Sequence, residues 1–203
     1  LAQLRAAATG GSRDWVYLVC PAGSGKTHLA LAVCAAAEQA GRGSAYLPLQ
    51  AAAGRLGDAL EALEGRDVVA LDGLDAIAGQ RGDEVALFDF HNRARAAGVT
   101  LLYTASAAPD ALGLVLPDLR SRLSQCGRIM LDALDDDGRG AVLRERAIRR
   151  GLALDQAAID WLLTRTGRDL GGLVVLLDRL DRESLAAKRR VTVPFLRKVL
   201  DAS

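Results

Sequence analysis

The stretch Trp15-Val-Tyr-Leu-Val-Cys20, followed by Pro21-Ala-Gly-Ser-Gly-Lys-Thr27, decides the fold of this chain. Its first six residues are rich in β-branched and aromatic side chains, which predicts a short buried strand. A loop of small residues comes next, and from Lys26 onward apolar residues recur at helical spacing up to Gly41, a typical helix stop. A strand, a loop of small residues and a helix in this order indicate a phosphate-binding loop rather than an ordinary turn with a helix cap.

The loop has the composition that phosphate binding requires, because several backbone N–H groups must converge on one anion without large side chains in the way. The candidate nucleotide-binding residues are Ala22, Gly23, Ser24, Gly25, Lys26, Thr27 and His28. Among them, Lys26 is expected to reach the β- and γ-phosphates, and the Thr27 hydroxyl is expected to ligate Mg²⁺.

Two residues of this stretch are better explained by structural roles than by nucleotide binding. Cys20 stands where the pattern G-x-x-x-x-G-K-[ST] has its first Gly, and we expect it to serve packing or loop geometry. His28 follows the motif directly, but a single His without a second ligand more often has a structural or surface role, and the same holds for His91.

Strands alternate with helices as far as residue 134, which predicts a parallel sheet with helices on both faces. The predicted strands cover residues 15–20, 44–49, 67–71, 99–104 and 128–131. The predicted helices between them cover residues 26–40, 51–63, 83–97 and 116–124. Residues 1–134 therefore form the predicted α/β base.

The pattern changes at residue 135, where Asp135, Asp136 and Asp137 form an acidic cluster suited to the N-terminus of a helix. The predicted helices after it cover residues 138–150, 155–166, 169–188 and 194–201, with no clear strand among them. Residues 135–203 are therefore predicted to form an all-helical lid subdomain.

Composition limits the classes of function. Of 203 residues, half are hydrophobic and a quarter are charged, so the chain can bury a sizeable core. The net charge of +1 argues against a broad grip on DNA or RNA. Three Cys without paired spacing favour a reducing cytoplasm over a disulfide framework or a zinc site, and no apolar run approaches the length of a membrane span. The chain begins with Leu, so we expect an N-terminal stretch to be missing.

A second motif, Val68-Val-Ala-Leu-Asp72, places an acid at the end of a buried strand. A P-loop NTPase holds Mg²⁺ or its water with such an Asp, whereas the alternative is an ordinary strand-ending Asp in a turn with Gly73. An enzyme that hydrolyses ATP briskly usually has a second acid where this chain has Gly73, and Asp75 lies further on. We therefore expect slow or absent intrinsic hydrolysis.

Polar residues also follow the fourth predicted strand. Thr104 and Ser106 are candidates to contact the γ-phosphate or the attacking water, although many strands end in Thr or Ser for structural reasons. The candidate catalytic residues are Arg122, Asp72, Ser106 and Thr104.

Arginines supply the remaining candidates. Arg120 and Arg122 lie on the predicted helix 116–124, either as solvated surface or as an arginine finger aimed at the nucleotide of a neighbouring subunit. Arg168 begins a predicted lid helix, from which it can fold back on bound phosphates.

The order of these motifs resembles DnaA-like AAA+ proteins, whose P-loop NTPase fold combines a five-stranded parallel sheet with a helical lid. The likeness is strongest to the Hda family of regulatory inactivators of the replication initiator DnaA. The likeness to DnaA rests on residues 23–29, 71–79, 101–106, 116–123 and 167–173. The likeness to Hda rests on residues 88–93, 116–123 and 180–196, and the last segment is the most specific. Together they span nearly the whole chain.

The resemblance implies an adenine nucleotide, ADP or ATP with Mg²⁺, with Thr27 and Asp72 on the metal and Arg168 as the sensor II residue. It implies that Arg122 acts in trans on ATP bound to DnaA. It also implies docking on the DNA polymerase sliding clamp through an N-terminal motif that is absent from these residues. Cys20 and Gly73 depart from the AAA+ pattern, which puts ATP hydrolysis in doubt but not ADP binding.

We therefore predict a cytoplasmic, nucleotide-binding regulator that limits replication initiation by promoting hydrolysis of DnaA-bound ATP. A homodimer is one open option, and neither sequence-specific DNA binding nor a membrane is expected. An autonomous P-loop ATPase, such as a helicase loader or an initiator fragment, is the enzyme alternative. A relic that only docks partners is the other alternative, and Cys20 is the feature that speaks for it.

Overall fold

The computed structural model of the chain describes residues 2–11, 14–21, 24–132, 134–165, 176–177, 179–183 and 192–201. Contacts between residues divide the chain into two compact units, Leu1–Asp132 and Ala133–Ser203. In the part that the structure describes, none of the helices combines the length and the apolar character needed to span a bilayer.

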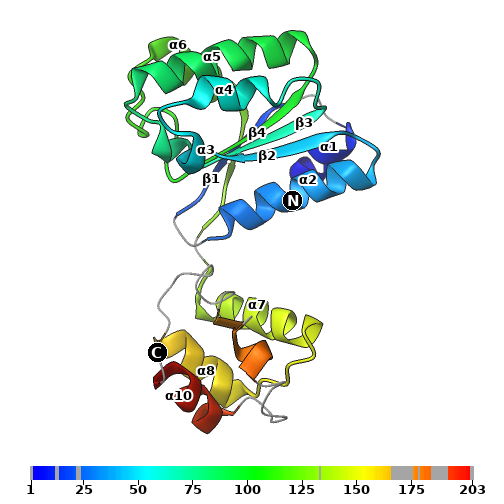
Figure 1. Cartoon of the computed structure of the whole chain (residues 1–203), viewed down its shortest axis with the longest axis vertical. Coiled ribbons are helices and arrows are strands. Elements are labelled where there is room, and N and C mark those ends of the chain that lie inside the picture. Colours follow the sequence, from blue (N-terminus) through cyan, green and yellow to red (C-terminus); the bar gives the residue numbers. More distant parts are fainter. Residues whose placement is uncertain are drawn as a thin grey trace. The chain divides into compact units, whose positions relative to one another are not determined.

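The first unit is built on a five-stranded sheet in the order β2-β3-β4-β1-β5 (Figure 1), and every pairing is parallel. The strands are β1 Val16–Val19, β2 Ser44–Pro48, β3 Val68–Asp72, β4 Thr100–Ala105 and β5 Gly127–Met130. Every residue of β1, β3 and β4 is buried, as expected of central strands covered on both faces. The predicted α/β fold with a five-stranded parallel sheet is confirmed.

Helices cover both faces of this sheet (Figure 1). On one face lie α1 Ala2–Thr9 and α2 Lys26–Gln39. On the other lie α3 Leu49–Ala52, α4 Leu56–Glu61, α5 Arg81–Ala96 and α6 Pro117–Ser124. Because α2 alone among the crossover helices lies on its face, the strand order and the helix layers change side next to β1, where parallel sheets bind ligands at the carboxyl ends of their strands.

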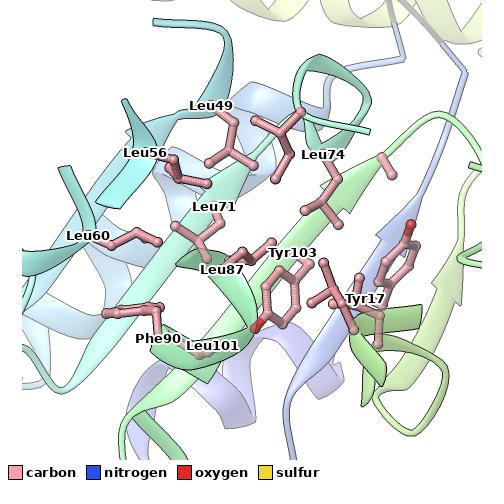
Figure 2. Close-up of a cluster of buried hydrophobic side chains, with 14 of the residues drawn as sticks. Tyr17, Leu49, Leu56, Leu60, Leu71, Leu74, Leu87, Phe90, Leu101 and Tyr103 are labelled. Carbon is pink, nitrogen blue, oxygen red and sulfur yellow. The ribbon is translucent and has the colours of Figure 1, made fainter. Parts of the chain in front are cut away.

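Successive residues of each central strand point alternately into two separate hydrophobic cores. Leu71 of β3 and Leu101 and Tyr103 of β4 pack against Leu87 and Phe90 of α5 in the larger core (Figure 2). The intervening strand residues face the smaller core, in which α2 buries a stripe at helical spacing formed by Ala30, Val33, Cys34 and Ala37. The period of two along each strand thus anchors helices on both faces.

The predicted helix at residues 51–63 is wrong, because the chain forms two short helices there, α3 and α4. Gly54 between them has φ +82°, a left-handed conformation that breaks a helix and favours glycine. The buried carboxylate of Asp83 accepts the backbone N–H groups of Gly54 at 2.6 Å and Leu56 at 3.2 Å, which fixes the break. Leu49, predicted to end the second strand, instead begins α3.

In its described residues, the second unit contains helices that pack around an apolar core of its own. Its described helices are α7 Asp136–Arg149, α8 Gln156–Arg165 and α10 Val193–Asp201. Asp135 caps α7 by accepting the Gly138 N–H at 2.8 Å, which confirms the predicted capping role of the acidic cluster. The predicted helix 169–188 lies largely outside the described residues, although residues 176–177 and 179–183 are helical. Leu143, Ile159 and Leu196 represent the buried core.

A buried histidine ties α5 to the sheet. His91 is 1% exposed, and its Nδ1 lies 3.0 Å from the Tyr103 hydroxyl. The Trp15 ring meets the imidazole edge to face at a centroid distance of 4.3 Å. Burial, reinforced by the positive charges of Arg122 and Arg95, lowers the pKa of His91 to about 4, so the ring is neutral at physiological pH.

We predict that this histidine makes the protein sensitive to acid. An unfolded His titrates near pH 6.5, so the contribution of neutral His91 to stability is complete above that pH and is lost as the pH falls toward 4. Between about pH 7 and pH 5 the loss should be about 2 kcal/mol, and His91→Gln should remove most of it. Urea unfolding of both proteins at the two pH values measures the difference. Equal losses would contradict the assignment.

Candidate nucleotide-binding site

The loop between β1 and α2 is anchored at both ends. Cys20 donates its backbone N–H to the Ala105 carbonyl at 3.0 Å, which extends the β1–β4 pairing to the start of the loop. At the other end Gly25 has φ +92°, a left-handed conformation that favours glycine immediately before α2. The structure thus places the motif as predicted, between a strand and a helix. Ala22 and Gly23 lie outside the described residues.

The Lys26 ammonium folds back over the start of the loop. Its Nζ donates to the Cys20 carbonyl at 2.8 Å and to the Pro21 carbonyl at 3.0 Å. The Ser24 hydroxyl also donates to the Pro21 carbonyl, at 2.6 Å. These carbonyls hold the cation at the mouth of the loop, where an incoming phosphate can attract it.

The N-terminus of α2 has the character of an anion site. Among the described residues no side chain caps it, and its first turn contains no acidic residue. The first amide groups of a helix lack partners within the helix and carry the positive end of its dipole. Together with Lys26, this end of the helix can bind phosphate oxygens. His28 is exposed in the same turn.

Asp72, at the carboxyl end of β3, is the centre of a hydroxyl cluster. Thr27 donates its hydroxyl to Asp72 Oδ2 at 2.6 Å, and Thr104 donates to Oδ1 at 2.5 Å. The Thr104 oxygen in turn accepts the Gly73 N–H at 2.9 Å. The structure therefore brings together three residues that the sequence selected from separate segments, and it buries both Asp72 and Thr104.

A third hydroxyl in this cluster was not predicted. Tyr46, on β2, donates to Asp72 Oδ2 at 2.8 Å. Partial burial, together with this bond to the carboxylate, raises the pKa of Tyr46 to about 12, so it remains a donor at physiological pH. The sequence signal was weak, because a tyrosine within a strand is also an ordinary core residue. The register of β2 beside β3 places Tyr46 opposite Ala70, two residues before Asp72, and only this register shows that the Tyr46 hydroxyl can contact the Asp72 carboxylate.

The donor set fits a magnesium nucleotide. Mg²⁺ prefers hard oxygen ligands and is usually held by one or two carboxylates together with phosphates and water, not by an all-protein cage. Thr27 and Asp72 offer one hydroxyl and one carboxylate at 2.6 Å from each other. Among the described residues there is no group of three or more His, Cys, Asp or Glu side chains that would hold an ion without a nucleotide.

The structure separates Ser106 from the Asp72 cluster. The Ser106 N–H donates to both carboxylate oxygens of Asp75, at 3.1 and 3.0 Å, and its hydroxyl donates to the same carboxylate. Both residues are exposed. Of the two polar residues predicted at the end of this strand, Thr104 therefore contacts Asp72 and Ser106 contacts Asp75.

Arg122 lies at the opposite edge of the sheet. It lines a cavity of about 500 Å³ together with Trp15, Thr100 and Gly127, which stand at or before the amino ends of β1, β4 and β5. Along β4, Thr104 lies four residues beyond Thr100, which at about 3.3 Å per residue places it roughly 13 Å from Thr100. Arg122 is half-buried, whereas Arg120 on the same helix is exposed, and Arg168 lies outside the described residues.

A buried acid holds the start of the helix that carries Arg122. Glu84, in the first turn of α5, has no exposed surface. Its carboxylate accepts the N–H groups of Leu116 at 2.7 Å, Gly79 at 2.8 Å and Val115 at 3.0 Å. Sequence reasoning missed this residue, because a Glu in the first turn of a helix is also favoured by the helix dipole alone.

The comparisons with known proteins agree with this geometry. Residues 136–200 match the family model "Hda, lid domain". The whole chain is similar to the crystal structure of domain III of the replication initiation protein DnaA from Thermotoga maritima, with a TM-score of 0.81 and 18% identity over 99% of this chain and 89% of the other. This chain has the fold of DnaA domain III and a lid similar to that of Hda proteins.

Two further solved structures show the breadth of the fold. AMPPCP-bound DnaA from Aquifex aeolicus has a TM-score of 0.70 and 20% identity over 92% of this chain and 63% of its own. The RuvB Holliday junction branch migration motor from Thermotoga maritima has a TM-score of 0.66 and 22% identity over 98% of this chain and 65% of its own. The chain thus spans less than two thirds of these two proteins, and at this identity the likeness shows the fold alone.

The role of Glu84 leads to a prediction about stability. Replacing it in Glu84→Ala leaves three backbone N–H groups without their acceptor, so the free energy of unfolding should fall by about 3 kcal/mol. Glu84→Gln, which keeps one acceptor oxygen, should lose less. Asp89→Ala removes an exposed acid from the same helix and should change stability by no more than about 0.5 kcal/mol. Denaturant unfolding measures the stability of all three variants. Similar losses for Glu84→Ala and Asp89→Ala would refute the role of Glu84 in holding these three N–H groups.

Proposed function

We propose that this Hda- and DnaA-like AAA+ protein binds an adenine nucleotide and promotes hydrolysis of ATP bound to DnaA, which limits replication initiation. It would act in the cytoplasm together with the DNA polymerase sliding clamp. The position of Arg122 is the observation that carries this proposal.

Arg122 is too far from its own nucleotide site to serve it. The phosphate loop, Asp72 and Thr104 lie at the carboxyl edge of the sheet, whereas Arg122 lies beside the amino ends of three strands. A guanidinium placed there can meet a phosphate only on another molecule. An arginine supplied in trans stabilises the negative charge that develops as the γ-phosphate is transferred. The partner's nucleotide is therefore the one that Arg122 would help to hydrolyse.

The chain's own site is suited to holding a nucleotide. Lys26 and the first amides of α2 would bind the phosphates, while Thr27 and Asp72 would hold Mg²⁺ directly and through its water. The bound metal would neutralise phosphate charge. The neighbour solved with AMPPCP, a DnaA of similar fold, supports the choice of an adenine nucleotide.

The residues of this site lead us to expect that the protein hydrolyses its own nucleotide only slowly. The residue after Asp72 is Gly73, which has no side chain, so no second carboxylate stands at that position. Asp75 is the next acid along the chain, and its carboxylate is engaged by Ser106. Without a free acid to orient water, the protein would retain its nucleotide and act mainly on that of its partner.

We predict that Arg122→Ala abolishes the stimulation of ATP hydrolysis by DnaA. The loss should be about 1,000-fold, the range expected for an arginine finger, while binding to DnaA should persist. Arg120→Ala, an exposed arginine on the same helix, should retain stimulation within about twofold. Phosphate release from a mixture containing ATP-loaded DnaA and each variant measures the effect. Equal stimulation by both variants would refute the assignment of Arg122.

We also predict that Lys26→Ala weakens adenine-nucleotide binding by at least about tenfold, because it removes charged hydrogen bonds to phosphate. Titration with fluorescent ADP measures the affinity, and an unchanged affinity would refute the site. Phosphate release by the isolated protein at about 1 s⁻¹ or faster would instead favour the autonomous ATPase.

A further inference from the structure

Asp72 accepts hydrogen bonds from three hydroxyl groups of its own chain. An ionised carboxylate has two oxygens with about four lone-pair positions in total. Thr27 and Tyr46 both donate to Oδ2, at 2.6 and 2.8 Å, and Thr104 donates to Oδ1 at 2.5 Å. One acceptor position, on Oδ1, remains for other donors.

Two of these hydroxyls already fix the direction of the carboxylate. Thr27 and Thr104 bind different oxygens from two sides, one from the first turn of α2 and the other from β4. Asp72 itself is 9% exposed, so its surroundings further restrict its rotation. The Tyr46 hydroxyl therefore adds little to the orientation of Asp72. What it does is to occupy the second lone pair of Oδ2.

The occupied lone pair of Oδ2 affects how Asp72 can bind the waters of Mg²⁺, and it does not affect the groups that bind the phosphates. Mg²⁺ keeps several of its waters, and these waters donate to nearby carboxylates. The Thr27 hydroxyl does not compete with them, because its hydrogen points at Asp72 while its oxygen remains free to ligate the metal. Because Thr27 contacts Oδ2, a metal on the Thr27 oxygen would bring its water nearest to that oxygen of Asp72, to which Tyr46 also donates. Tyr46 is on β2, whereas the phosphate-binding groups are in the loop after β1 and on α2.

We propose that Tyr46 restrains the contribution of Mg²⁺ to nucleotide affinity, because its hydroxyl competes with metal-bound water for Asp72. This inference rests on the proposed binding of an adenine nucleotide. The inference implies that the site retains ADP with little help from the metal. This property would depend on the Tyr46 hydroxyl oxygen, which Tyr46→Phe removes.

The test compares ADP affinity with and without the metal in the full chain. Fluorescent ADP is titrated into the unsubstituted protein and into Tyr46→Phe, first in excess EDTA and then in excess Mg²⁺. For each protein the ratio of the two dissociation constants gives the advantage conferred by the metal. A misfolded fraction reduces the number of binding sites alike in both buffers, so it leaves this ratio unchanged.

We expect Tyr46→Phe to leave the affinity in EDTA unchanged within about twofold and to raise the metal advantage by about three- to tenfold, the worth of one released hydrogen-bond acceptor. Tyr17→Phe is the matched control, because the Tyr17 hydroxyl donates to the Ala107 carbonyl at 2.9 Å and not to Asp72. Its metal advantage should equal that of the unsubstituted protein.

Two results overturn the inference, and they are distinguishable. If the unsubstituted protein binds ADP but the metal advantage of Tyr46→Phe is unchanged or lower, Tyr46 does not compete with metal-bound water. A lower advantage would show instead that Tyr46 supports the metal. If the unsubstituted protein binds no ADP in either buffer, the proposed nucleotide binding fails, and the inference fails with it.

Discussion

The common direction of the five strands is the constraint on which the rest of the base depends. Parallel pairing brings every carboxyl end to one edge of the sheet and every amino end to the other. The phosphate loop, Asp72 and Thr104 therefore meet although they lie far apart in the sequence. The same constraint sends Arg122 to the other edge, because the helix after β4 must return to the start of β5. One geometrical rule thus separates the group that would act on a partner from the groups that would hold the chain's own ligand.

Three buried acids show how the base accommodates negative charge through hydrogen bonds. The carboxylates of Asp72, Asp83 and Glu84 are almost fully buried, and each accepts several hydrogen bonds from hydroxyl or backbone N–H groups. A buried carboxylate without such partners would be strongly destabilising. The two consecutive acids of α5 hold different segments, since Asp83 binds the α3–α4 connection and Glu84 binds the approach to α6. One turn of helix thus fixes two loops on the same face of the sheet.

The sequence was sufficient for the fold class and for much of the cluster, and the reasons are local. Central strands with unbroken apolar runs and a helix after a glycine-rich loop are features that short-range chemistry determines. Thr27 and Asp72 could be paired in advance because both belong to motifs with a defined structural context. Tyr46, Asp83 and Glu84 could not, because their roles depend on which backbone or side-chain groups the tertiary fold brings to them. The break at Gly54 was missed for a related reason, since the acid that stabilises it lies on another helix.

Cys20 gives the nucleotide site a chemical property that its position in the sequence does not suggest. A thiol at the start of a phosphate loop would ordinarily be a candidate for oxidation or alkylation. Here the side chain has no exposed surface, and burial raises the pKa of the Cys20 thiol. Since the thiolate is the reactive form and access is blocked, oxidants and thiol reagents that modify exposed cysteines would leave this loop intact. Oxidation at Cys20 would therefore not be a route by which the redox state of the cell alters the proposed nucleotide site.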